Sequence, residues 1–244
     1  MRLSICVAAW TLCCSLTALA QAPPANAPPP RWERTAELSL VATGGNTDTQ
    51  TVGAGASLVF RPEGWTTDAR TAFVRSKAND LETAKSFVAD FRQARTLTAR
   101  LEAFGRYGYL SDRFAGIEHR NTVDGGLGYK LLTGPVHLLR VDGGLGYTRE
   151  ARVVGEQVSF ALANFGGAYK WQLSKTADIT DSAILTLPLS QKDAWRFNNA
   201  LAAAAALTRV LSLKLSYDSK FNNTPVPGFE KTDRLMTAAI VVRF

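Results

Sequence analysis

The chain has 244 residues, 46% of them hydrophobic, and a formal net charge of +7. This length suits one large domain or two small ones. The basic residues are spread along the whole chain instead of forming a block, which argues against nucleic acid as a partner. After residue 20 no apolar stretch reaches the roughly 20 residues that a membrane-spanning helix requires. Hydropathy alone would predict a soluble protein, but a membrane β-barrel carries its signal in alternation.

Residues 1–20 have the composition of a secretory signal peptide. Arg2 precedes an apolar run that ends in the small-residue pattern Ala18-Leu19-Ala20, so we expect cleavage after Ala20. A short transmembrane anchor is the alternative, although the run is shorter than a spanning helix. All three cysteines of the chain lie in this segment: Cys6, Cys13 and Cys14. The mature protein is therefore expected to have no disulfide and no thiol chemistry.

Residues 21–31, rich in proline and alanine, predict an extended periplasmic tail. From residue 32 to 244 the same alternation of apolar and polar residues continues, which indicates one domain. In ARLEAFGRYGYL (99–110), Leu101, Ala103 and Tyr107 alternate with Arg100, Glu102 and Arg106. Such strict alternation predicts β-strands. Twelve are expected, at about 34–42, 49–60, 65–76, 85–96, 98–110, 120–131, 136–149, 157–173, 177–187, 194–207, 210–219 and 234–244.

The connections between these strands alternate in length. Short turns such as 61–64 and 133–135 alternate with longer polar segments such as KANDLETAK (77–85) and SDRFAGIEHR (111–120). Outer-membrane barrels have short turns on the periplasmic side and longer loops outside. This sorting favours such a barrel over a soluble β-sandwich.

Alternation alone leaves open whether the apolar face points to lipid or to a core. Two features decide in favour of a membrane barrel. The last strand ends in an aromatic residue with alternating apolar positions, which resembles the signal read by the barrel-assembly machinery; these positions are Met236, Ala238, Ile240, Val242 and Phe244. Closure would also remove the free edges of a twelve-stranded sheet.

The sequence therefore predicts an all-β, transmembrane antiparallel barrel of about twelve strands in the outer membrane. Outer-membrane lipid and lipopolysaccharide are the expected partners, with the assembly machinery during biogenesis. The charged faces then line the lumen, and their candidate residues are Arg70, Asp90, Arg92, Arg100, Glu102, Arg106, Asp124, Arg140 and Asp142.

Three segments resemble a known family. They are AELSLVATGGNTDTQT with its GNT at 45–47, DRFAGIEHRNTVDGGLGYKLL with the pattern Asp112, Phe114, Gly116, Ile117 and Arg120, and the last strand ending in Phe244. Together they resemble the salt-induced outer-membrane proteins, a domain family of unknown function, over about residues 32–244. The resemblance implies an outer-membrane barrel of a Gram-negative bacterium and supplies no activity.

Few residues suggest catalysis. A lipid hydrolase would need a Ser–His pair, and Ser111 with His119 is the available combination, without an esterase-type context. His137 follows a turn at the opposite rim. Acids expected in outer loops are Asp80, Glu82, Asp112 and Glu118, and scattered loop acids are usually solvated. We predict no enzyme, no cofactor and no bound metal.

A twelve-stranded barrel is intermediate between barrels filled by side chains and open porins. Mixed lumen charges are compatible with a salt-bridged interior or with a narrow pore for small solutes. The sequence favours a passive pore or an envelope component that responds to osmotic stress. The alternatives are a non-conducting structural or adhesion barrel acting through its outer loops, and thirdly the lipid hydrolase.

The hexapeptide DGGLGY occurs at 124–129 and again at 142–147. Neither copy opens a helix, so a phosphate-binding loop is a poor interpretation. A three-residue turn at 133–135 would place Gly126 opposite Asp142, Asp124 opposite Gly144 and Gly128 opposite Arg140. We expect the glycines to let the wall curve and to leave room for the charged side chains.

Overall fold

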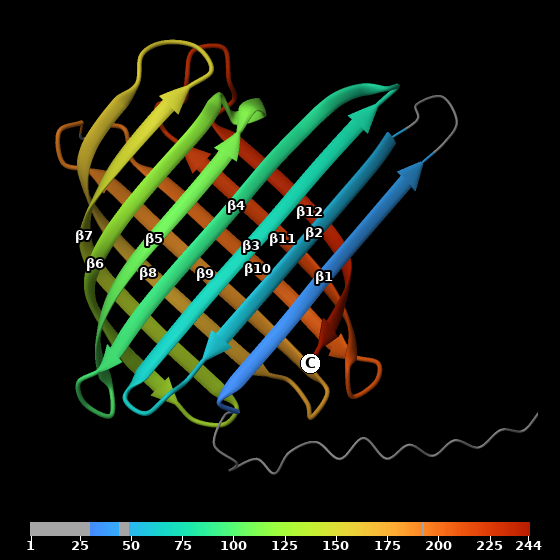
Figure 1. The fold of residues 1–244 in the computed structure, drawn as a ribbon, viewed down its shortest axis with the longest axis vertical. Coiled ribbons are helices and arrows are strands. Elements are labelled where there is room, and N and C mark those ends of the chain that lie inside the picture. Colours follow the sequence, from blue (N-terminus) through green and yellow to red (C-terminus); the bar gives the residue numbers. More distant parts are fainter. Residues whose placement is uncertain (1–29, 44–48, 192) are drawn as a thin grey trace, which may run out of the picture.

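The alternating segments form twelve antiparallel strands that close into a barrel in a computed structural model (Figure 1). The structure describes residues 30–43, 49–191 and 193–244, so the expected signal peptide and most of the proline-rich tail lie outside the described residues. The strands are β1 (Trp32–Thr43), β2 (Thr49–Phe60), β3 (Trp65–Ala78), β4 (Leu81–Thr96), β5 (Leu101–Asp112), β6 (Ile117–Thr133), β7 (His137–Arg152), β8 (Val158–Gln172), β9 (Ala177–Pro188), β10 (Arg196–Ala206), β11 (Leu211–Asn222) and β12 (Thr232–Arg243). The predicted fold class and strand number are confirmed. A single short 3₁₀ helix, η1 (Arg113–Ala115), is assigned within the described ranges, where no helix is long and apolar enough to cross a membrane.

Each strand pairs with its neighbours in the sequence, and the first strand pairs with the last. The β1–β12 register runs from Thr35 opposite Arg243 to Leu38 opposite Ile240. This pairing satisfies backbone groups that would otherwise form two open edges in lipid.

The apolar face points outward. Leu38, Leu40 and Met236 are 62%, 71% and 79% exposed, whereas Ser39 and Val241, on the other face of the same two strands, are 7% and 5% exposed. A soluble barrel would show the opposite arrangement. The outward residues therefore form the lipid-facing band of a transmembrane barrel.

The barrel has two different rims. We call the rim of the connections at 61–64, 97–100, 134–136, 173–176 and 207–210 the turn rim, and the other the loop rim. At the turn rim Trp32 stacks on Phe60 at 3.9 Å, and at the loop rim Trp195 lies 4.8 Å from Phe221. Aromatic rings near both ends of the apolar band are typical of the two membrane interfaces.

The connection between β3 and β4 is shorter than the sequence indicates. The strands continue to Ala78 and from Leu81, which leaves a two-residue turn of Asn79 (φ 48°) and Asp80 (φ 64°). Asn and Asp tolerate this left-handed conformation, and two such residues make a tight hairpin turn. The polar segment therefore extends the strands instead of forming a long loop.

The register predicted for DGGLGY is wrong by two residues. Asp124 lies opposite Gly146, Gly126 opposite Gly144, and Asp142 opposite Gly128. The hairpin turn lies further along the chain than expected, because Thr133 pairs with Leu138, and the irregularity between Lys130 and Leu132 changes the offset from three residues to two. Each acid nevertheless lies opposite a glycine of the other copy.

Glycine is required at these positions because neighbouring atoms lie too close to leave room for a Cβ atom. A Cβ atom on Gly128 would lie 2.5 Å from Oδ1 of Asp142, and one on Gly146 would lie 2.5 Å from Cβ of Asp124. A Cβ atom on Gly144 would lie 2.7 Å from the carbonyl oxygen of Gly125, and one on Gly126 would collide with the backbone of Gly143. The repeat therefore leaves room in the wall between β6 and β7.

We predict that the double substitution Gly126→Val and Gly144→Val prevents folding of most of the protein, because the new side chains collide with backbone that cannot move aside. The folded fraction is measured by heat-dependent mobility on SDS gels after refolding into detergent. Gly105→Val is the matched control, because no atom lies within 4 Å of a Cβ atom at Gly105. Equal folding of the double variant and this control would refute the explanation.

Candidate functional site in the lumen

The lumen contains two adjoining cavities. The polar cavity, of about 330 Å³, is lined by charged and amide side chains from β3 to β6, from β8 and from β10 to β12. The wide cavity, of about 590 Å³, is lined largely by small residues, including Gly53, Gly55, Ala72, Ala202, Ser216 and Ala239. Arg70, Asp90, Asp218 and Lys220 line both cavities, so the two adjoin. The lumen thus holds one cavity with a charged and amide lining and one with a lining of mostly small residues.

A first group of charges fills the lumen near the turn rim. We call it the turn-rim cluster, and it consists of Asp68, Arg92, Glu102, Lys130, Arg140 and Asp142. Arg92 donates to Glu102 at 2.6 Å and lies 3.4 Å from Asp142, while Arg140 lies 3.2 Å from Asp142. Three cations and three acids leave this cluster neutral, so it needs no external counter-ion.

The middle of the lumen holds a bidentate ion pair. Arg106 donates to Asp124 through Nε at 2.9 Å and through Nη2 at 2.7 Å. The Phe104 ring lies 5.7 Å from the Arg106 guanidinium and 4.7 Å from that of Arg92. The ring therefore packs between the middle pair and the turn-rim cluster, and a guanidinium group from each of them lies against it.

A second cluster lies near the loop rim and is unbalanced. We call Arg120, Glu150, Arg152 and Arg196 the Glu150 cluster. The Glu150 side chain is 1% exposed and contacts Arg120 at 2.7 Å, Arg152 at 2.9 Å and Arg196 at 3.0 Å. Glu150 is on β7 and Arg196 on β10, so this ion pair spans two intervening strands inside the barrel. One carboxylate faces three guanidinium groups, which leaves an excess of two positive charges.

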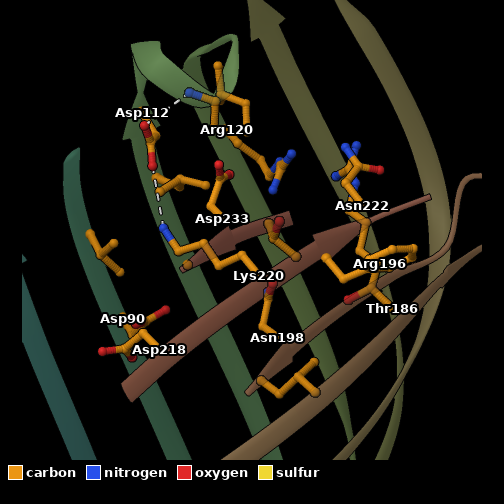
Figure 2. Close-up of a pocket in the computed structure, with 18 of the residues that line it drawn as sticks. Asp90, Asp112, Arg120, Thr186, Arg196, Asn198, Asp218, Lys220, Asn222 and Asp233 are labelled. Atoms are coloured by element: carbon orange, nitrogen blue, oxygen red, sulfur yellow. Dashed lines mark hydrogen bonds and ion pairs between the residues drawn. The ribbon is translucent and has the colours of Figure 1, made fainter. Parts of the chain in front are cut away.

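Part of the loop rim is covered by the connection between β11 and β12, residues 223–231. Val226 in this connection is 3% exposed, and it contacts Gly116 in the β5–β6 connection on the opposite side of the barrel. Gly116 has φ 77°, and a Cβ atom there would lie 2.9 Å from Cβ of Val226 and from Cδ2 of Phe229. Lys220 reaches across to Asp112 at 3.4 Å, as Figure 2 shows. We call residues 223–231 the cap.

The lumen residues expected from the sequence fall into three places. Arg70, Asp90, Arg106 and Asp124 line the polar cavity. Arg92, Glu102, Arg140 and Asp142 belong to the turn-rim cluster. Arg100 lies in the exposed turn 97–100, where its carbonyl accepts from the Lys130 amide, so it joins neither group.

Sequence reasoning missed the Glu150 cluster. Glu150 and Arg152 follow the expected strand 136–149 and therefore fall in a predicted loop. Glu150 nevertheless lies on the same face of β7 as Asp142 and Thr148, at even-numbered positions. Arg120 likewise keeps the parity of Asp124. Continuing the alternation beyond the expected strand end at 149 would have identified Glu150 and Arg152, whereas Arg120 and Arg196 lie within the expected strands 120–131 and 194–207.

The candidate catalytic pair has other hydrogen bonds. The Ser111 hydroxyl donates to the backbone carbonyl of Glu118 at 2.7 Å, and His119 lies within β6 opposite Ala151. His137, at the turn rim, pairs through Nδ1 with the Tyr169 hydroxyl at 2.8 Å. This geometry supplies no activated serine.

Comparison with known proteins assigns the chain to a family. Residues 36–244 match the family described as "Protein of unknown function, DUF481", so the chain belongs to it. "Uncharacterized protein YdiY" of Escherichia coli (strain K12) is 26% identical over 220 residues, which is 89% of this chain and 84% of that protein.

Solved structures with a similar fold include a NanC porin, with a TM-score of 0.48 and 11% identity over 86% of this chain and 98% of that one. Another is the translocator domain of the autotransporter NalP from Neisseria meningitidis, with a TM-score of 0.45 and 15% identity over 87% of this chain and 86% of that one.

We predict that Glu150→Gln destabilises the folded barrel by about 3–5 kcal/mol, because three guanidinium groups lose their only shared anion in a buried site. The change is measured as a shift of the urea unfolding midpoint. The matched control is Glu33→Gln, whose pair with Arg61 has side chains 43% and 28% exposed, and it should cost less than about 1 kcal/mol. A loss for Glu150→Gln no larger than that of the control would contradict the prediction.

Proposed function

We propose, for this member of a family of unknown function, that the barrel is a narrow passive pore for small polar solutes in the outer membrane, with the turn rim facing the periplasm. The observation that carries the proposal is the pair of adjoining lumen cavities of about 330 and 590 Å³. A barrel filled only by its own side chains would have no such space. The role in envelope or osmotic stress would follow from solute passage.

The lumen charges support a preference for polar over apolar solutes. Fixed charges of both signs lie in the lumen, from the Glu150 cluster to the turn-rim cluster. Such charges and hydrogen-bonding groups attract polar solutes and set the selectivity of a pore.

The cap favours a second candidate, a non-conducting structural or adhesion barrel. Its contact with Gly116 joins opposite walls at the loop rim and narrows the entrance. In this candidate the loop-rim surface binds a partner and the lumen charges serve stability alone. The lipid hydrolase receives no support, because Ser111 is bonded to a backbone carbonyl.

Planar-bilayer recording tests the pore. We expect the purified full chain to give discrete current steps in 1 M KCl. Replacing residues 224–229 by two glycines should raise the single-channel conductance severalfold, because the cap contact with Gly116 is then lost. A wild-type protein that is silent at every voltage, and stays silent without the cap, would leave the structural barrel as the function.

The outward residues of β12 support the proposal that the assembly machinery reads this strand. Met236 and Phe244 are 79% and 72% exposed. We expect deletion of Phe244 to lower the amount of folded barrel in cells while leaving refolding into detergent unchanged, because the residue then acts in recognition and not in packing. Heat-dependent gel mobility measures both quantities. An equal loss in cells and in detergent would indicate a packing role instead.

Outer-membrane lipid is the proposed partner of the apolar band. Lipopolysaccharide is proposed for its loop-rim side, where outward cations such as Lys85, opposite Arg75 on β3, lie beyond the apolar residues. Arg75 is paired with Glu82 at 2.7 Å, so anionic headgroups would pair with Lys85.

A further inference from the structure

The polar cavity has two sides of opposite charge. Arg120 and Arg196 of the Glu150 cluster line it, and so do the carboxylates of Asp90 and Asp218. Figure 2 shows Arg196 on one side of the cavity and Asp90 with Asp218 on the other. Opposite charges held apart in a partly desolvated space create a field across it.

The basic side lacks a counter-charge. Glu150 neutralises one of the three arginines around it. The Arg196 side chain is 9% exposed, and its Nε is buried without a hydrogen-bond partner in the part of the chain that the structure describes. Buried cations are normally paired, so this side is suited to accept an anionic group.

On the acidic side, Asp90 lies opposite Arg70 on β3, but Asp218 has no such partner beside it in the wall. The cross-strand neighbours of Asp218 are Ala200 and Leu235, neither of which carries a charge. Lys220, two residues away on the same face, is directed to Asp112. A cationic group in the cavity would therefore meet an available carboxylate at Asp218.

We propose that the polar cavity binds a small zwitterion, whose carboxylate pairs with Arg120 and Arg196 and whose ammonium group pairs with Asp218. A simple anion would satisfy the basic side but meet the acidic side unpaired. A simple cation would have the reverse difficulty. The cavity of about 330 Å³ is large enough for an amino acid or a betaine together with a few waters. The inference rests on the proposed function in that the lumen must admit solutes.

Isothermal titration of the full chain in detergent at pH 7 tests the ligand class. The probes are 4-aminobutyrate, butyrate and butylammonium, which have the same chain length and differ in charge. We expect 4-aminobutyrate to bind at least about tenfold more tightly than either singly charged probe, which corresponds to about 1.4 kcal/mol. Equal affinity for 4-aminobutyrate and butyrate, or no binding of any probe up to 50 mM, would overturn the proposal.

Variants assign the two ends of the ligand. Arg196→Gln should weaken 4-aminobutyrate and butyrate alike, about tenfold, through loss of the anion partner. Asp218→Asn should reduce the affinity for 4-aminobutyrate to that for butyrate, while butyrate itself binds no more weakly. Lys214→Gln is the control, because Lys214 pairs with Glu37 and lines the wide cavity. If Asp218→Asn still bound 4-aminobutyrate more tightly than butyrate by the same factor as the wild type, the role of Asp218 as the partner of the ammonium group would be refuted.

Two precautions keep the outcome unambiguous. Heat-dependent gel mobility confirms that each variant is folded before titration, and Arg196→Lys, which retains the cation, should recover part of the binding. The titration needs no membrane, so a barrel that binds 4-aminobutyrate without conducting refutes the pore and leaves the site. A barrel that conducts without binding 4-aminobutyrate refutes the binding site and leaves the pore.

Discussion

The rest of the structure depends on the pairing of β1 with β12. A backbone amide or carbonyl left without a partner in lipid costs several kcal/mol, so a sheet in the membrane is stable only when its first and last strands meet. The last strand is therefore the one that completes the structure. Closure also separates an inner from an outer face, and period-two alternation places most charged residues of a strand on one of them.

The interior combines two solutions to the burial of charge. The turn-rim cluster and the Arg106–Asp124 pair balance each cation with an acid, as a structural filling would. The Glu150 cluster and Asp218 leave charges of opposite sign uncompensated on the two sides of one cavity. Because desolvated charges are costly without partners, the unbalanced part of the lumen is where a solute would contribute most. The balanced part explains how the barrel stays folded when no solute is present.

Sequence reasoning predicted the fold because alternation is a local signal and a closed barrel is the only sheet that lipid accepts. Alternation also placed Arg92, Glu102 and Asp124 on the charged faces, since each lies inside an expected strand. Sequence reasoning was wrong in the register of the β6–β7 hairpin, because neither the pairing of Thr133 with Leu138 nor the irregularity between Lys130 and Leu132 has a clear mark in the sequence. It missed Glu150 because polar residues near a strand end resemble a loop, and it did not connect Glu150 with Arg196, which lies in the expected strand 194–207. Their meeting depends on the curvature of the wall, which no local pattern encodes.

The contact between the cap and Gly116 has a mechanical consequence. The hydrogen bonds between strands hold the circumference of a barrel constant, but they offer little resistance to a change of its cross-section from round to flat. Val226 and Gly116 belong to walls six strands apart, and the Lys220–Asp112 pair joins the same two walls just below. Lateral pressure from the bilayer that altered the distance between these walls would have to break both contacts. The loop-rim end is thereby held to one shape, and the deformability of the tube is shifted toward its other end.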